Sequence, residues 1–253
     1  PTHVIAVFDP PGEVFRHEFY PQYKANRDPM PDDLRLQIPN IKRILEAMGI
    51  AMLEVPNYEA DDVMATVAHQ IDQAGGKAFL VTSDKDCRQL ISDNVKMYNI
   101  RKDVIFDEQD LMEKWGVRPE QVVDFQALVG DSVDNVPGVQ QIGPKTATAL
   151  LAEFGDLEGV LENAHAVKAK NRRENLMNGR DDAMLSRRLV ELDRHVNVEI
   201  DWEAAQIGGM DSDSLEELCD EFGFRRLKDR LLNADVETAP VVWECDYVLV
   251  ESI

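Results

Sequence analysis

The chain of 253 residues has 44% hydrophobic and 30% charged residues, a globular balance that excludes intrinsically disordered and fibrous proteins. No apolar run approaches the ~20 residues of a membrane span and no signal peptide opens the chain, so we expect a cytoplasmic protein without membrane contact. Three distant cysteines exclude a disulfide framework. The net charge of −21 would repel nucleic acid unless the charges are segregated, so the position of the basic residues is informative.

The first half of the chain alternates strand and helix patterns. The predicted strands cover residues 4–8, 51–55, 78–82, 96–100 and 104–106. The predicted helices between them cover residues 34–48, 58–74 and 86–92. This alternation is typical of an α/β fold with a mostly parallel sheet flanked by helices.

From about residue 110 the pattern becomes helical. The predicted helices cover residues 108–115, 119–129, 144–154, 157–162, 167–177, 181–192, 212–221 and 225–232. We therefore expect an α/β domain at residues 1–109 and a helical domain at 110–234. Residues 235–253 are predicted to hold a linker and the first strand of a following domain. Because the chain opens on Pro1 without Met, we interpret it as a fragment.

Eight carboxylates follow predicted strands, lie at a predicted helix start or lie in the loop after the predicted helix 119–129. They are Asp9, Glu59, Asp61, Asp62, Asp84, Asp86, Asp131 and Asp134. An α/β sheet brings such positions together at the carboxyl ends of its strands. Clustered carboxylates repel one another, and two divalent cations such as Mg²⁺ or Mn²⁺ would relieve this repulsion and promote attack on a phosphate. Any one of the eight alone could instead be a helix cap.

Cations and aromatic rings are interleaved at residues 15–27, directly after the first of these carboxylates. Arg16, Tyr23, Lys24 and Arg27 belong to this segment. Bases stack on aromatic rings while cations meet phosphates, so the mixture suits single-stranded nucleic acid. Lys24 and Arg27 are three residues apart and are expected to share a helix face. An ordinary amphipathic surface helix is the alternative.

A glycine-flanked turn occupies residues 136–147, with the sequence Val-Pro-Gly-Val-Gln-Gln-Ile-Gly-Pro-Lys-Thr-Ala. Gly138 and Gly143 flank a tight hairpin, and Pro144 suits the first position of a helix. The free N–H groups of a helix start hold phosphate without reading base sequence, and Lys145 adds positive charge. The pattern predicts a helix-hairpin-helix element at residues 136–154, with a plain helix–turn–helix connection as the alternative.

Six motifs in this order resemble the 5′-nuclease (5′→3′ exonuclease) domain of bacterial DNA polymerase I, in the flap endonuclease superfamily. They are Phe8-Asp9, the Arg16–Arg27 run, and residues 58–62, 82–86, 130–135 and 138–146. The likeness covers about residues 1–234. It implies a PIN-like nuclease core and metal-dependent hydrolysis of DNA or RNA-primer phosphodiester bonds in replication and repair. The implied substrate is branched or nicked duplex DNA with a 5′ flap or an RNA primer.

The resemblance also implies a role for each matching residue. The implied ligands or near-ligands of two Mg²⁺ or Mn²⁺ ions are Asp9, Glu59, Asp61, Asp84, Asp86 and Asp134, with Asp62 and Asp131 closely associated. Lys24 and Arg27 would contact the scissile phosphate from a helical gateway and are the predicted catalytic cations. The expected DNA-binding residues are Arg16, Tyr23, Gly138, Val139, Gly143, Lys145 and Thr146, with a K⁺ ion held at the hairpin.

The chain departs from the family pattern at its start. The family begins with a strand that ends in an Asp-Gly pair, and this segment would precede Pro1. We therefore expect a missing N-terminal strand, a missing metal-ligand aspartate and reduced activity. The resemblance further implies a monomer joined to polymerase domains in the bacterial cytoplasm, near the nucleoid. Two alternatives stay open, a PIN-type ribonuclease and a DNA-binding module without catalysis; the hairpin and the helical second domain argue against the ribonuclease.

Overall fold

The computed structural model describes residues 1–232, so the linker and strand predicted at 235–253 lie outside the described residues. The chain divides into two compact units. Within the described residues, one comprises Pro1–Val4, Asp32–Ala51 and residues 201–232, and the other comprises Ile5–Pro31 and Met52–Ile200. The domain boundary predicted at 109/110 does not coincide with the boundaries of these two units, and it stays a prediction.

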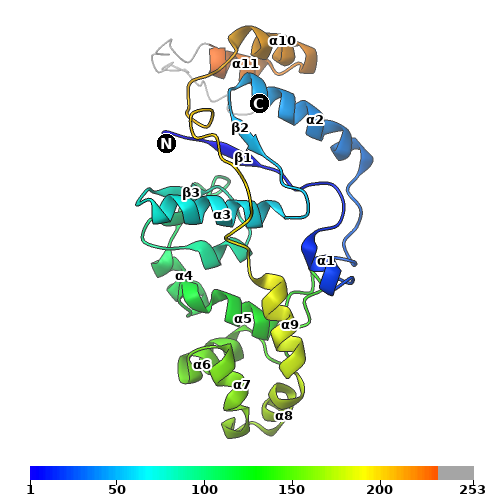
Figure 1. Cartoon of the computed structure of the whole chain (residues 1–253), viewed down its shortest axis with the longest axis vertical. Helices are drawn as coiled ribbons and strands as arrows, with labels where there is room; N and C mark the ends of the chain where they lie inside the picture. The colour runs from blue at the N-terminus through cyan, green and yellow to red at the C-terminus, as the bar shows by residue number, and fades with distance from the viewer. Residues whose placement is uncertain (233–253) are drawn as a thin grey trace, which may run out of the picture. The chain divides into compact units, whose positions relative to one another are not determined.

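The first unit contains the helices α2 (Asp32–Ala47), α10 (Ser212–Phe222) and α11 (Arg225–Leu232) (Figure 1). Its buried cluster is formed by Ala47, Leu215, Leu218 and Cys219. The side chain of Asp211 caps α10 by accepting a hydrogen bond from the Ser214 N–H, which satisfies one of the free donors of a helix start.

The strands form two separate ladders. One pairs β1 (Ile5–Val7) with β2 (Ala51–Leu53), and the other has the order β3 (Ala78–Leu80), β4 (Val95–Asn99), β5 (Val104–Phe106). β3 and β4 are parallel, whereas β4 and β5 are antiparallel. A parallel pair needs a long crossover, which the chain supplies between β3 and β4 through a short 3₁₀-helix, η1 (Asp86–Leu90).

The second unit also holds the remaining helices. They are α1 (Phe15–Phe19), α3 (Ala60–Gln73), α4 (Glu108–Trp115), η2 (Pro119–Gln121), α5 (Val122–Val129), α6 (Pro144–Phe154), α7 (Leu157–Glu162), η3 (Ala164–Ala166), α8 (Lys170–Asn178) and α9 (Arg180–Val190). Figure 1 shows α5 to α9, in green to yellow, as a purely helical part of this unit. Its core includes the fully buried side chains of Leu111, Leu128, Leu151 and Leu176.

The predicted fold class is confirmed, since helices flank a small sheet and a helical part follows. The expected helix face shared by Lys24 and Arg27 is wrong, because α1 ends at Phe19 and residues 21–26 form turns. Lys24 has a φ of 56°, which no continuous helix allows, and its N–H donates to the Asp134 carbonyl at 3.0 Å. A long-range backbone contact therefore replaces the expected helix face.

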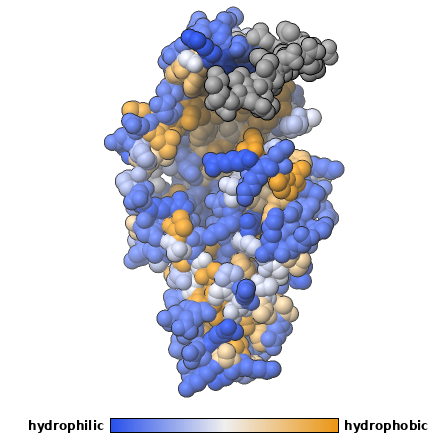
Figure 2. Space-filling model, turned by 180° about the vertical axis from the view of Figure 1, so that it is seen from behind, coloured by the Kyte–Doolittle hydropathy of each residue, from blue (hydrophilic) through white to orange (hydrophobic). Residues whose placement is uncertain are grey.

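The surface matches the high charge of the chain. Hydrophilic residues dominate the face seen in Figure 2, and hydrophobic residues lie there in small separate groups. Among residues 1–232, no helix is both long enough and apolar enough to cross a membrane.

Candidate active site

Four of the predicted carboxylates form one acidic cluster, which we define as Asp9, Asp61, Asp84 and Asp86. Asp9 follows β1, Asp61 lies in the first turn of α3, and Asp84 and Asp86 follow β3. Asp9 Oδ1 accepts a hydrogen bond from the Ala60 N–H at 2.8 Å, which ties the end of β1 to the start of α3. Charges on Asp9, Asp84 and Asp86 all act on Asp61. Three segments distant in sequence thus bring their carboxylates together.

The acidic cluster is electrostatically strained in the absence of cations. Burial and the neighbouring charge of Asp84 raise the pKa of Asp61 to about 7. Burial and Asp84 also raise the pKa of Asp86 to about 6. A divalent cation removes this repulsion, and carboxylate oxygens are the ligands that Mg²⁺ and Mn²⁺ prefer, so the donor set fits such ions. Among residues 1–232, no three or more His, Cys, Asp or Glu side chains have an arrangement that could hold a metal ion.

Two buried side chains that the sequence analysis missed support the acidic cluster. The Cys87 thiol donates to Asp61 Oδ1 at 3.4 Å, and the Gln126 amide donates to Asp86 Oδ1. Burial, together with Asp61, raises the pKa of the Cys87 thiol, so it stays protonated and can donate. The only signal in the sequence was a glutamine inside the apolar run of α5, where a polar residue needs a partner.

Two further predicted ligands are paired with the predicted catalytic cations. Lys24 Nζ forms an ion pair with Glu59 and lies 3.8 Å from Asp134 Oδ2. Arg27 forms an ion pair with Asp134 Oδ1. Asp131 is held by Lys85 Nζ at 2.7 Å. The structure thus brings Glu59 and Asp134 together through Lys24, although outside the acidic cluster.

The position of Arg16 does not agree with its predicted contact to DNA. Its side chain is 1% exposed and binds Asp62, which is 0% exposed, through two hydrogen bonds of 2.6 and 2.8 Å. The guanidinium also donates to Glu59 at 3.0 Å and to the carbonyls of Leu189 and Glu191. A buried charge needs this full set of partners. Both carboxylate oxygens of Asp62 accept hydrogen bonds within the same network, and its predicted association with the metal site stays a prediction.

Tyr23 is also placed differently from the prediction. It is 5% exposed, and its hydroxyl donates to Glu59 Oε2 at 3.0 Å. A ring packed this way presents no face for a base to stack on, so the expected DNA contact is not available in this structure. The ring instead supports Lys24, whose Nζ lies 5.0 Å from the ring centroid.

The predicted hairpin connects α5 to α6. Gly138 has a φ of +62°, and a Cβ there would lie 2.5 Å from the Gly130 nitrogen, so glycine is required for packing. The side chain of Val139 is 3% exposed and packs in the helical core, and the predicted contact of this residue with DNA stays a prediction. Gly143 caps α6, and a Cβ on it would meet nothing within 4 Å.

The start of α6 keeps the features expected of a phosphate-binding element. The side chain of Lys145 is exposed and that of Thr146 is half-buried. The N–H of Thr146 is already bonded to the Gly143 carbonyl at 2.9 Å. The exposed Gly143 and Lys145 are therefore the members of this element best placed to meet a phosphate.

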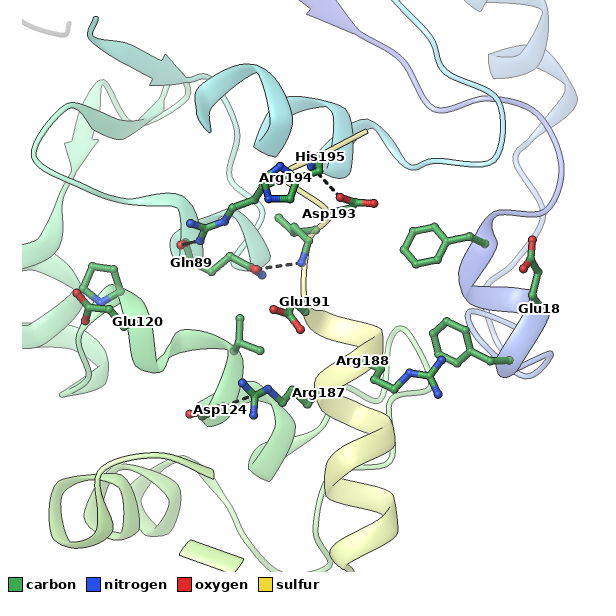
Figure 3. Close-up of a pocket in the computed structure, with 15 residues that line it drawn as sticks. Glu18, Gln89, Glu120, Asp124, Arg187, Arg188, Glu191, Asp193, Arg194 and His195 are labelled. Carbon is green, nitrogen blue, oxygen red and sulfur yellow. Dashed lines mark hydrogen bonds and ion pairs between the residues drawn. The ribbon is translucent and has the colours of Figure 1, made fainter. Parts of the chain in front are cut away.

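A pocket of about 800 Å³ lies in the second unit and is lined by other residues than the acidic cluster (Figure 3). Arg187, Arg188 and Arg194 line it, together with acidic residues such as Asp124. Arg187 is paired with Asp124 at 3.8 Å, and Arg194 donates to the Gln89 carbonyl at 2.7 Å. Arg187 and Arg194 thus have partners within the protein, and the guanidinium of Arg188 lies 4.1 Å from the centroid of the Phe19 ring. The carboxylates of the acidic cluster do not line this pocket. Its size therefore does not mark it as the active site.

Sequence comparison identifies two matching families. Residues 1–116 match the family described as "5'-3' exonuclease, N-terminal resolvase-like domain", and residues 117–213 match "5'-3' exonuclease, C-terminal SAM fold". The 5'-3' exonuclease of Aquifex aeolicus (strain VF5) is 39% identical over 227 residues, which are 90% of this chain and 77% of that protein.

DNA polymerases I are also similar to the chain. The enzyme from Rhizobium leguminosarum is 45% identical over 204 residues, covering 81% of this chain and 20% of that protein. The enzyme from Streptococcus pneumoniae serotype 4 is 37% identical over 257 residues, covering 100% of this chain and 29% of that protein. The chain thus spans less than a third of the length of these polymerases.

Solved structures share the fold. The T5 5'-exonuclease with bound zinc has a TM-score of 0.65 at 24% identity, covering 87% of this chain and 83% of that chain. The catalytic core of Rad2 in complex with DNA substrate has a TM-score of 0.57 at 19% identity, covering 91% of this chain and 78% of that chain. At these identities the likeness concerns the fold alone.

Proposed function

The chain belongs to the 5'-3' exonuclease family, and from this membership we propose that it is a divalent-metal-dependent 5′ nuclease acting on branched DNA. The observation that carries the proposal is the acidic cluster, where three segments bring Asp9, Asp61, Asp84 and Asp86 together and two of the pKa values are raised. The proposed substrate is duplex DNA with a 5′ flap, a nick or an RNA primer.

The residues of the acidic cluster would hold Mg²⁺ or Mn²⁺, and bound ions would supply an activated water and neutralise charge on the leaving oxygen. Metal-bound neighbours in the same fold, such as the T5 5'-exonuclease, support this proposal. Glu59 and Asp134 would join the set once Lys24 and Arg27 turn toward a phosphate. A K⁺ ion at the hairpin stays a prediction, as do the monomeric state, a covalent link to polymerase domains and the expected location near the nucleoid.

Lys24 would supply positive charge where negative charge grows on the phosphate during hydrolysis. Its side chain is partly exposed, and its Nζ already lies beside the carboxylates of Glu59 and Asp134. Arg27, which is more exposed, would orient the same phosphate by its planar fork of donors.

The hairpin and the start of α6 would bind the duplex backbone without reading bases, through Gly143 and Lys145. This separates the two tasks in the chain, since carboxylates serve cleavage and exposed N–H groups and cations serve affinity.

Cleavage of a labelled 5′-flap DNA in Mg²⁺ tests the proposal. The assay includes a single-stranded RNA and an EDTA control. We expect Mg²⁺-dependent cleavage near the flap junction. Cleavage of RNA alone would favour the ribonuclease, and flap binding without cleavage would favour the DNA-binding module.

A further inference from the structure

Gln126 is a buried amide that reaches the acidic cluster from the helical part of the second unit. It lies on α5, is 4% exposed, and donates through Nε2 to Asp86 Oδ1. Asp86 begins η1, and α5 packs against η1. The contact therefore connects two elements that are 40 residues apart in sequence.

The other end of this amide has no partner. Gln126 Oε1 is the one buried side-chain polar atom among residues 1–232 without a hydrogen bond. A buried acceptor left unpaired loses its hydration without compensation. Val122, Phe125, Ala127 and Leu128 on α5 are buried and apolar, whereas the buried Asp124 is paired with Arg187. A methionine or leucine would therefore suit position 126 better for stability alone. The feature that distinguishes Gln126 from an apolar residue is therefore its Nε2 donor, which bonds to Asp86.

We propose that Gln126 is a positioning residue that fixes the orientation of the Asp86 carboxylate for divalent metal binding; this inference rests on the proposed function. An amide donor on one oxygen of a carboxylate restricts rotation of the group and leaves the second oxygen for a cation. Such outer-shell hydrogen bonds typically change metal affinity by about 10–100-fold when they are removed.

The helix that carries Gln126 also leads into the other acidic segment. α5 ends at Val129, and the loop with Asp131 and Asp134 follows at once. The Gln126–Asp86 hydrogen bond therefore fixes the spacing between the acidic cluster and Asp134, whose charge already acts on Asp86. Loss of the bond would loosen both segments of the metal site.

Mn²⁺ binding to the full chain tests the inference without reliance on cleavage. Free Mn²⁺ is measured by its EPR spectrum for wild type, Gln126→Met and the control Gln121→Met. Gln121 is a matched control, because it is also a buried glutamine and its amide donates to the Gly155 carbonyl at 2.7 Å, not to the acidic cluster. We expect a Kd for Mn²⁺ about 10–100-fold weaker in Gln126→Met and within about twofold of wild type in Gln121→Met.

Two further variants make the outcomes separable. Wild-type affinity in Gln126→Met overturns the positioning role. If that variant fails to fold by circular dichroism, Gln126→Asn decides, because it keeps the amide but is one methylene too short to reach; weakened Mn²⁺ binding supports the role and wild-type binding overturns it. Asp86→Asn tests the metal site itself: unchanged Mn²⁺ affinity there would overturn the proposed site, whereas a loss there with no loss in Gln126→Met would remove only the positioning role.

Discussion

Lys24 is held by two of the predicted metal ligands, since its Nζ pairs with Glu59 and lies 3.8 Å from Asp134 Oδ2. A cation in this position offsets the charge of the two carboxylates while no metal is bound. If Glu59 holds a metal ion as proposed, that ion would compete with Lys24 for Glu59, and metal binding would free the ammonium group for a phosphate.

Replacement of Lys24 tests its catalytic role. Lys24→Ala should lower single-turnover cleavage of a 5′-flap DNA by about 10²–10³-fold, because a donor that meets growing charge in the transition state is lost. Affinity should change little, and Lys24→Arg should recover part of the rate, since the guanidinium fork differs in shape. Lys102→Ala, at an exposed lysine of a turn, is the control. A loss of less than about threefold at saturating enzyme would make Lys24 a bystander.

The acidic cluster should be required for cleavage of DNA but not for affinity for DNA. Asp84→Asn, in a version that cleaves, should abolish hydrolysis while DNA binding without metal stays within a few-fold, because the phosphate-binding elements lie elsewhere. Asp93→Asn, an exposed carboxylate on the same connection, should leave both properties unchanged. Near wild-type cleavage by Asp84→Asn would contradict the assignment of the metal site.

The hairpin should act on affinity through Lys145 and Gly143. Lys145→Ala should reduce the slope of log Kd against log salt for duplex binding by about one, because one phosphate contact is lost. Gly143→Ala should weaken binding without loss of stability, because its Cβ meets no protein atom. Gly138→Ala should instead destabilise the fold, since its Cβ would collide with Gly130. Equal salt slopes for wild type and Lys145→Ala would exclude the predicted phosphate contact.

The Arg16–Asp62 pair should be a major contribution to stability. Arg16→Met leaves the buried Asp62 charge without its partner, and the expected loss in the free energy of unfolding is about 3–5 kcal/mol in urea denaturation. Adding Asp62→Leu should restore part of this loss. Arg43→Met is the matched control, because Arg43 forms a similar two-bond pair with Glu221 on the surface and should lose far less. Comparable losses in the two arginine variants would rule out a special role for burial.

Stability without metal should fall as pH rises. Folded Asp61 and Asp86 have pKa values of about 7 and about 6, above the ordinary value of 3.8. Between pH 3.8 and about 7 the folded chain therefore binds more protons than the unfolded chain, so the contribution of these groups to the unfolding free energy decreases with pH. In EDTA, Asp61→Asn should be stabilising at pH 8 and lose this advantage near pH 5. A pH-independent effect of Asp61→Asn in thermal unfolding would refute this coupling.

Local sequence rules predicted the elements whose ends are determined locally. The helix at 108–115 was predicted with both ends correct: Asp107 accepts from the N–H groups of Gln109 and Asp110, and Gly116 ends it in the left-handed conformation. The grouping of Asp9 with Asp61, Asp84 and Asp86 followed from their common place after strands and at a helix start.

Long-range contacts explain what the sequence did not predict. The burial of Arg16 depends on Asp62 and on carbonyls of residues 189 and 191, and no spacing rule indicates such partners. The turn at Lys24 depends on a backbone bond to Asp134, 110 residues further along the chain. Short-range patterns therefore predicted which carboxylates are candidates for the site, but not which of them would be paired with cations.

The hydrogen bonds around Arg16 also determine when this site can fold during protein synthesis. Arg16 donates to the Leu189 carbonyl, 173 residues away, and Asp62 accepts from the Asp193 N–H, 131 residues away. A nascent chain that ends at residue 116, where the match to the first exonuclease family ends, carries Arg16 and Asp62 but none of these backbone partners. Arg16, which also donates to Glu59, can thus reach its full set of hydrogen-bond partners only after α9 has left the ribosome. We therefore expect the two family segments to fold together around this site, and a protein shortened to residues 1–116 should lack an ordered Glu59.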